Sequence, residues 1–218
     1  MLRFRLKSLN WRDLLKELFI VVLGILIAFA LNNWAQNRSN DSLLQDYLIS
    51  LRTDLAADTV EMTENLNVLH RNMAFVQSLM PHFYREMPGR DTIAASFFKR
   101  SIFPYFNAHD ATVNTLINTG NLKLIQSFEL KKALLDHYDK YDLLYQENER
   151  AESFVRDYVA KYMMTEIDQG VFFQSSGDAA LKDFKFRNIA FSVYGIIQIQ
   201  EKRYNEALER ARKLMRML

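Results

Sequence analysis

The stretch LFIVVLGILIAFALNNWAQ, residues 18–36, decides the fold of this chain, because water does not comfortably hold so apolar a segment on a protein surface. Leu18 to Leu31 contains fourteen residues without a charge, which is roughly 21 Å of α-helix. A bilayer's hydrocarbon core is ~30 Å thick, so the flanking residues must lengthen the span. Leu14 and Leu15 do so, and the sequence predicts a transmembrane helix over residues 14–35.

The ends of this segment carry the residue types that favour a membrane interface. Trp11 and Trp34 lie where interfacial aromatic residues are expected, and Lys16 and Glu17 are placed to extend toward headgroups or to pair with each other. Gly24 and Ala28 form a small-xxx-small pair, which lets two membrane helices approach closely. We therefore predict that Gly24 and Ala28 pack against a partner helix.

Two other interpretations of the apolar segment stay open. Ala28-Phe29-Ala30 has the small-x-small form of a signal-peptide cleavage site. A buried helix of a soluble domain would also be apolar. We favour a retained anchor, because no turn-forming residue lies between Gly24 and the next polar residues, where a cleavage site needs extended backbone.

Charge is unevenly distributed along the chain. Residues 1–17 carry five bases and two acids, and residues 201–218 carry six bases and three acids, which leaves the middle net negative. The positive-inside rule then predicts a cytoplasmic basic tail at residues 1–17 and an extracytoplasmic domain at 36–218. Basic ends on an acidic body favour membrane lipid over nucleic acid as a partner, although a solvated charged face explains the C-terminal bases equally well.

Beyond the apolar segment the sequence predicts long helices. Six glycines and three prolines in 218 residues leave few places to break one. Apolar residues at coiled-coil spacing form the first predicted seam: Leu44, Leu48, Leu51, Leu55, Met62, Leu66, Leu69, Met73, Val76 and Met80. The step from Asp58 through Met62 to Leu66 is a stutter, which predicts a locally straight stretch with Asp58 as a polar seam residue.

Proline, glycine and capping residues mark the helix ends in the rest of the chain. Pro81 and Pro88-Gly89 end the first helix, a short helix is expected at residues 91–99, and Pro104 keeps the connection FFKRSIFPYF irregular. Further boundaries are predicted from caps and turns: Asp110 and Ser127 as N-caps, Gly120 or Asn121 as a terminator, Gly170 and Ser175-Ser176-Gly177 as the last turn, and Asp183 opening the final helix.

Two more long helices complete the predicted fold. The segment from Phe128 to about Asp168 has a seam with a polar centre: Leu134, Tyr138, Tyr141, Tyr145, Asn148, Glu152, Val155, Val159 and Tyr162. The final helix has the most regular seam: Phe186, Ala190, Val193, Ile197, Gln200, Tyr204, Ala207, Ala211, Leu214 and Leu218. We predict an all-α protein whose N-terminal transmembrane helix continues into an antiparallel, coiled-coil-like bundle of long helices.

Two motifs give the chain a family resemblance. The first comprises Glu17, the run Gly24-Ile25-Leu26-Ile27-Ala28 and the pair Asn33-Trp34. The second comprises these residues: Thr112, Leu116, Gly120, Leu122, Leu124 and Ile125. With these motifs the chain resembles a bacterial family of small single-pass membrane proteins classed only as a domain of unknown function. The resemblance implies a retained membrane helix in the inner membrane, a helical periplasmic domain, and no catalytic residues.

Little in the sequence indicates an enzyme. The absence of cysteine excludes disulfides and thiolate chemistry, and the pair His109-Asp110 is the only one that suggests metal binding. The other histidines lack metal-ligand spacing, so we predict no catalytic site, no metal and no cofactor. Asn148 and Glu152 are expected either to fix register and oligomer state or to mark a cavity, with Asp58 facing them if the helices pair antiparallel. The alternative is that both point outward because the predicted seam is out of phase by one residue.

The sequence thus leads to two hypotheses about function. The first is a non-enzymatic, membrane-anchored protein that acts by association, as a homo-oligomer or as an accessory subunit of a membrane complex. The second is an extracytoplasmic ligand-sensing module that signals through a partner. In that case Tyr138, Tyr141, Tyr145 and Asn148 would line the ligand pocket, although tyrosines at helical spacing more often belong to a core.

Overall fold

The computed structural model describes residues 11–170, 172 and 178–218, and the chain divides into two units, residues 1–48 and 49–218. Over the described residues the protein is all-α, without a strand, as the sequence predicts. Most of the predicted basic tail and the predicted turn Ser175-Ser176-Gly177 lie outside the described residues.

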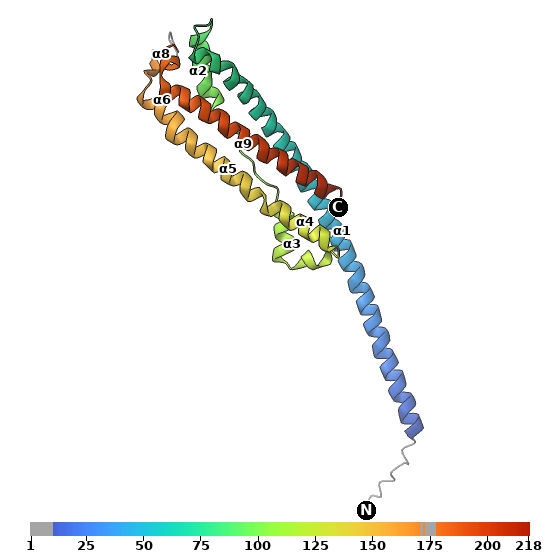
Figure 1. Cartoon of the computed structure of the whole chain (residues 1–218). Coiled ribbons are helices and arrows are strands. Elements are labelled where there is room, and N and C mark those ends of the chain that lie inside the picture. Colours follow the sequence, from blue (N-terminus) through green and yellow to red (C-terminus); the bar gives the residue numbers. More distant parts are fainter. Residues whose placement is uncertain (1–10, 171, 173–177) are drawn as a thin grey trace, which may run out of the picture. The chain divides into compact units, whose positions relative to one another are not determined.

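The helices follow one another along the chain as labelled in Figure 1. Their bounds are α1 (Trp11–Leu79), η1 (Met80–Phe83), α2 (Arg90–Arg100), α3 (Ala111–Asn118), η2 (Asn121–Leu124), α4 (Phe128–Asp139), α5 (Tyr141–Phe154), η3 (Val155–Ala160), α6 (Lys161–Thr165), α8 (Asp178–Lys182) and α9 (Phe184–Met215). The segments η1 and η2 are 3₁₀ turns, whereas η3 is a π-helix.

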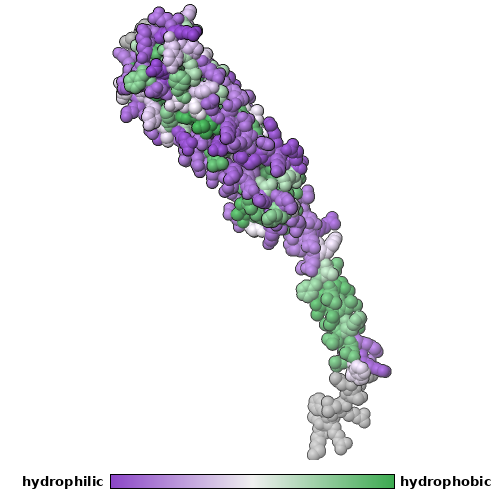
Figure 2. Space-filling view, viewed as in Figure 1, coloured by the Kyte–Doolittle hydropathy of each residue, from purple (hydrophilic) through white to green (hydrophobic). Residues whose placement is uncertain are grey.

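The first unit consists of the N-terminal part of α1. Its described residues, 11–48, are helical throughout, as expected for a stretch without proline and with the single glycine Gly24. Every residue from Trp11 to Ser39 is exposed. Figure 2 shows hydrophobic residues on the visible face of this helix, and an 18-residue window of it reaches a mean hydropathy of 2.6. This one helix is long and apolar enough to cross a membrane, a property that anchors and signal sequences share.

In the second unit, α1 and α9 pack side by side and run in opposite directions. Arg52 of α1 donates to the carbonyl of Met215, and farther along α1 Gln77 donates to the Tyr194 hydroxyl. The residue numbers of successive contacts therefore increase along α1 and decrease along α9. This antiparallel pairing confirms the predicted bundle.

The predicted seam of α9 is buried, and that of α1 is buried in its central part. In α1 the buried set includes Leu51, Leu55, Asp58, Met62, Leu66, Leu69 and Val76. The prediction is wrong at Met73 and Met80, which are partly exposed because Asn72 and Leu79 occupy the buried positions, and Leu44 and Leu48 are also partly exposed. In α9 every predicted seam residue from Phe186 to Leu214 is buried, and only Leu218 is partly exposed. Asp58, Met62 and Leu66 are consecutive buried positions four residues apart, so the stutter in α1 is confirmed.

The predicted single helix from Phe128 to Asp168 is wrong in two respects. It turns at Lys140 between α4 and α5, and it widens into the π-helix η3 before ending at Thr165 in α6. The predicted seam is also out of phase by one residue within α5, where the buried positions include Tyr141, Leu144, Asn148 and Ala151. Tyr145 and Glu152, predicted in the seam, are therefore partly exposed and exposed, respectively.

An extended segment takes the place of another helix in the bundle. Residues 101–110 have no helical structure, as Pro104 predicts, and in Figure 1 they run as a thin coil beside α5 and α9. Phe106 anchors the segment: it is fully buried, and its ring lies 5.0 Å from the Tyr141 ring and 6.3 Å from the Tyr204 ring. The segment thus fills the space between α1, α5 and α9.

Helix boundaries follow the predicted caps and turns with two differences. Gly170, predicted in the last turn, is helical, and the Phe172 N–H donates to the Asp168 carbonyl across it. The second difference is at Asp110. The Ser127 side chain accepts from the Leu130 N–H, and the Asp183 side chain accepts from the Lys185 N–H. Gly120 has a φ of 69°, which suits its place after α3. Asp110 occupies the N-cap position of α3, but its side chain makes no capping hydrogen bond.

Candidate functional site

The most unusual group in the second unit is the carboxylate of Asp58, which is 0% exposed. Its Oδ1 accepts from the backbone N–H of His109 at 2.8 Å and lies 2.8 Å from Nδ1 of the His109 ring. Its Oδ2 accepts from the Tyr141 hydroxyl at 2.8 Å. A buried carboxylate is destabilising by several kcal/mol unless it is paired and hydrogen-bonded. Three donors from two other parts of the chain meet that requirement.

His109 is the partner of this site that solvent reaches, since half of its side chain is exposed. The hydrogen bond to Asp58 raises the pKa of His109, burial partly offsets it, and the charges of Asp58, Glu61 and Asp54 add to it. The protonated ring is therefore favoured, and it forms an ion pair with Asp58.

On the buried side, Tyr141 joins Asp58 to His137, whose Nε2 lies 2.8 Å from the Tyr141 hydroxyl. A hydroxyl has one proton, and Tyr141 donates it to Asp58, so we assign His137 Nε2 as the donor to the Tyr141 oxygen. Burial and the charge of Arg210 lower the pKa of His137 to about 4. The His137 ring is therefore neutral, and its Nδ1 carries no proton and can accept a hydrogen bond.

Polar side chains of α1 hold the backbone of the extended segment. Besides Asp58, three residues of α1 bond to it: Glu61 accepts from the Asn107 N–H at 3.0 Å, and the amides of Asn65 and Asn72 donate to the carbonyls of Tyr105 and Ile102 at 3.0 and 3.4 Å. Positions 58, 61, 65 and 72 share one face of a helix. These side chains supply the hydrogen bonds that a neighbouring strand would otherwise provide.

Three of the four predicted ligand-site residues border one pocket of about 570 Å³. We call it the tyrosine pocket; it is lined by Tyr138, Tyr141 and Tyr145 together with Val113 and Ile117 of α3. The hydroxyls of two of these tyrosines are engaged by the extended segment, since Tyr138 donates to the His109 carbonyl and Tyr145 accepts from the Ala108 N–H. That a ligand binds here stays a prediction.

The polar residues expected to face Asp58 lie elsewhere. Asn148 is buried, but its side-chain oxygen is 3.5 Å from the Gln200 amide of α9. Glu152 is exposed, because the buried face of α5 passes from Asn148 to Ala151. His109 pairs with Asp58 and not in a metal pair with Asp110, and the part of the chain that the structure describes contains no cluster of three or more His, Asp or Glu residues suited to a metal ion.

The sequence singled out Asp58, His109 and Tyr141 separately, but it did not indicate that they pair, and it gave no signal for His137. Asp58 stood out as a charge at a seam position, but His109 is 51 residues away in sequence and lies in a segment without periodicity. His137 occupies a buried position between the predicted seam residues Leu134 and Tyr138. Their pairing depends on the path of the extended segment and on the α4–α5 turn, neither of which a helical pattern can reveal.

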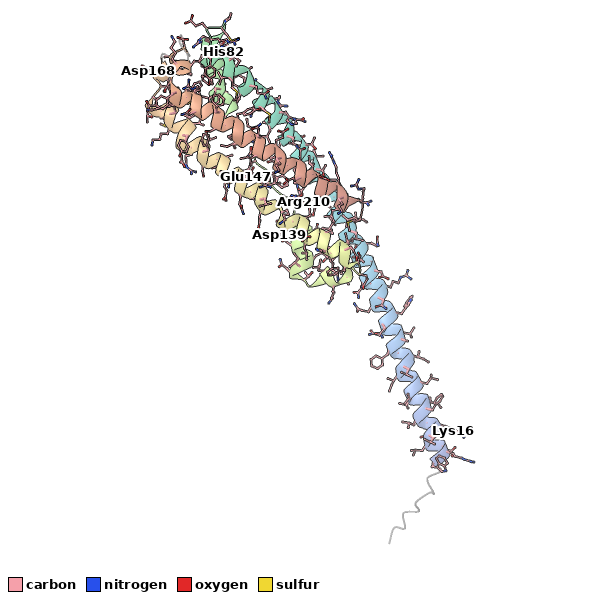
Figure 3. All side chains as sticks on the ribbon, in the orientation of Figure 1. Lys16, His82, Asp139, Glu147, Asp168 and Arg210 are labelled. Atoms are coloured by element: carbon pink, nitrogen blue, oxygen red, sulfur yellow. The ribbon has the colours of Figure 1, made fainter. Side chains whose placement is uncertain are left out.

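The predicted membrane residues all lie on α1. Gly24 and Ala28 are exposed, and a Cβ added at Gly24 would meet nothing within 4 Å. Lys16, at the start of the helix in Figure 3, pairs with Asp13 at 3.2 Å and not with Glu17. Trp11 and Trp34 are exposed, and the Arg38 guanidinium lies 5.7 Å from the Trp34 ring centre.

Comparison with known proteins gives one match. No curated protein matches the chain, and no solved structure matches it either. A family model of unknown function, DUF6090, matches residues 17–178. That range includes the apolar helix from Glu17 onward, Asp58 and its partners His109 and Tyr141, and the tyrosine pocket. Since the match covers most of the chain, the protein belongs to this family of unknown function, DUF6090.

Proposed function

We propose that this protein is a non-enzymatic, membrane-anchored helical protein that acts by association through its N-terminal helix. Residues 14–35 cross the bacterial inner membrane, the basic N-terminal residues lie in the cytoplasm, and the helical bundle lies in the periplasm. The partner is a second copy of the chain or a subunit of a membrane complex.

The observation that carries this proposal is the exposure of the whole apolar segment. Leu18 to Leu31 are exposed on every side of the helix, and no described residue covers them. So large an exposed apolar surface is unfavourable in water and favourable in a bilayer. Five bases among residues 1–17 support a cytoplasmic N-terminus.

Gly24 supports association within the membrane. Glycine inside a helix is destabilising by about 1 kcal/mol relative to alanine. Nothing within 4 Å of Gly24 requires its small size. A helix from another chain that packs on Gly24 and Ala28 would account for it, because small residues let two helix backbones come close.

Disulfide crosslinking tests the proposal without background, because the chain has no cysteine. Ala28→Cys is expected to crosslink in native membranes, whereas Leu26→Cys, about 200° around the helix from Gly24, serves as the matched control. A product of twice the chain's mass indicates a homodimer. A heavier or mixed product, identified by mass spectrometry, indicates an accessory subunit. Equal or absent crosslinking at both positions would remove the interface from this face.

The tyrosine pocket supports a second candidate function, an extracytoplasmic ligand-sensing module that signals through a partner. The pocket has aromatic walls and oriented hydroxyls, and it adjoins the network that fixes the extended segment. Native mass spectrometry of the purified full-length protein tests this function. A retained small molecule that Tyr145→Ala releases would favour sensing, and a ligand-free oligomer would favour association.

A further inference from the structure

The tyrosine pocket has a second property besides its aromatic walls, because its charged lining is entirely acidic. Four aspartates line it: Asp110 at the N-cap of α3, Asp136 and Asp139 in the last turn of α4, and Asp142 in the first turn of α5. Figure 3 labels Asp139. The described residues that line the pocket include no lysine and no arginine. Carboxylates from three helices thus share one pocket without a cation in its wall.

These carboxylates have few partners within the protein. Asp110, Asp136 and Asp142 form no ion pair with a described residue, and their side chains accept no hydrogen bond from one. Asp139 lies 3.8 Å from the Lys140 ammonium, in a pair whose two side chains are both largely exposed. An exposed pair of this kind is weak. At least three charges of the pocket are therefore uncompensated.

Acidic residues are not left unpaired in every pocket of the second unit. Three acids line a smaller pocket beside α6 and α8, and all three are engaged. Glu166 pairs with Lys185, and the side chains of Asp168 and Asp183 accept hydrogen bonds. Uncompensated carboxylates therefore distinguish the tyrosine pocket from this one.

The uncharged lining of the tyrosine pocket suits the carbon chain of an organic ligand. Tyr138 and Tyr145 are partly exposed, whereas Tyr141 is 2% exposed and contributes little surface. Ile117 and Leu135 are 47% and 40% exposed, so apolar surface is accessible beside the carboxylates. Aromatic rings attract an ammonium group that lies over a ring face. Aliphatic side chains favour contact with methylene groups.

The acidic and aromatic parts of the lining lie close together. Burial raises the pKa of Tyr138 and of Tyr145, a backbone hydrogen bond partly offsets the increase for Tyr145, and the charges of Asp58 and Asp110 add to the increase for both. The His109 ring, next to Asp110 in the chain, is already paired with Asp58. A positive charge within the pocket would therefore be stabilised by carboxylates and aromatic rings together.

We propose that the tyrosine pocket binds a linear aliphatic polyamine, which is a chain of methylene groups carrying two or more ammonium groups. The ammonium groups pair with Asp110, Asp136 and Asp142, and the methylene groups lie against Ile117 and Leu135. The proposal rests on the second candidate function, the ligand-sensing module, and names the ligand class of its pocket. The pocket volume of about 570 Å³ is within the range of small-molecule sites.

Other ligand classes match the pocket less well. A metal ion needs ligands that converge on one point, and the described residues contain no group of three or more His, Asp or Glu residues suited to one. Carboxylates that do not converge suit positive charges spaced along a chain. A single quaternary ammonium ion suits the aromatic rings but balances only one carboxylate. An anion finds no lysine or arginine among the described lining residues.

Isothermal titration calorimetry tests the site, with spermidine as the probe, the full-length protein in phosphatidylcholine nanodiscs, and empty nanodiscs as the blank. We expect saturable binding of spermidine. Mg²⁺ and tetramethylammonium at the same concentration are expected to bind far more weakly. The first has no methylene groups for the apolar lining, and the second has only one charge.

Paired variants separate the pocket from general charge effects. Asp142→Asn is expected to weaken spermidine binding roughly fivefold, the size of one exposed charge interaction. Asp136→Asn, on the neighbouring helix α4, should weaken it by a similar factor. Glu149→Gln, at an exposed acid of α5 outside the pocket, is the matched control and should leave the affinity unchanged. Circular dichroism establishes which variants are folded.

The proposal is overturned if spermidine binding does not saturate, if Mg²⁺ or tetramethylammonium binds as tightly, or if Glu149→Gln loses as much affinity as the two aspartate variants. Native mass spectrometry separates this failure from failure of the sensing function. A retained non-basic molecule that Tyr145→Ala releases would exclude a polyamine and leave sensing in place. The absence of both a retained molecule and spermidine binding would exclude both.

Discussion

Replacing Tyr141 by phenylalanine removes one oxygen atom from the centre of the buried network. The hydroxyl donates to Asp58 Oδ2 and accepts from His137 Nε2, both at 2.8 Å. A hydrogen bond to a charged group contributes about 1.5–3 kcal/mol, and the unpaired His137 N–H adds about 1 kcal/mol. We therefore expect Tyr141→Phe to lower the free energy of unfolding by about 3 kcal/mol, which is a decrease in Tm of roughly 10 °C for a domain of this size.

The matched control is Tyr162→Phe. Its hydroxyl also donates to a carboxylate at 2.8 Å, but Asp183 is only partly buried. Water can replace that hydroxyl, so we expect a loss of less than about 1 kcal/mol. Thermal unfolding of the full-length variants, followed by circular dichroism at 222 nm, measures both. Equal decreases in Tm for the two variants would refute the claim that the Asp58 network stabilises the bundle.

Three further predictions concern pH, the membrane helix and the seams. Stability should be greatest near pH 6.5. Above that pH the contribution of His109, whose pKa is raised when folded, is lost as the ring deprotonates, and below it His137, whose pKa is about 4 when folded, must be protonated on unfolding. In Tm measured from pH 4 to 9, His109→Gln should flatten the alkaline side, and an unchanged profile would contradict the role of its pairing with Asp58. Gly24→Leu should reduce the crosslinking of Ala28→Cys in membranes without changing the Tm of the bundle, whereas unchanged crosslinking would exclude Gly24 from the interface. Ile197→Asp, at a fully buried seam position, should unfold the bundle, because burying an unpaired charge is destabilising by several kcal/mol. A soluble, fully helical variant would show that the seam is misassigned.

The sequence predicted those features of the fold that repeat along a helix. The seam of α9 and the central part of the α1 seam are regular in sequence and buried in the structure, and even the stutter at Asp58 could be read from the spacing. The caps Ser127 and Asp183 were predictable because they act on N–H groups within three residues of themselves. Local rules were sufficient wherever the determining contacts are local.

Features that depend on distant residues could not be predicted in the same way. The turn at Lys140 and the π-helix η3 contain no glycine or proline to mark them, so the sequence predicted one continuous helix. The seam predicted for that helix was out of phase by one residue at Tyr145 and Glu152. The pairing of Asp58 with His109 requires the path of the extended segment, which is fixed by side chains of α1 that a periodicity analysis treats as solvent-exposed or neutral. The candidate site includes His109 of the extended segment, where the helical periodicity of the sequence ends.

The π-helix η3 also has a consequence for how this chain tolerates changes in length. Ala151 of α5 and Val159 within η3 are both buried and are eight positions apart, whereas Leu144 and Ala151 within α5 are seven apart. Seven residues are two turns of a regular seam, so the spacing from α5 into η3 contains one additional residue. A chain that is one residue shorter between positions 152 and 158 would form a continuous α-helix with the same buried faces. The bundle therefore accommodates this one-residue difference in chain length at η3.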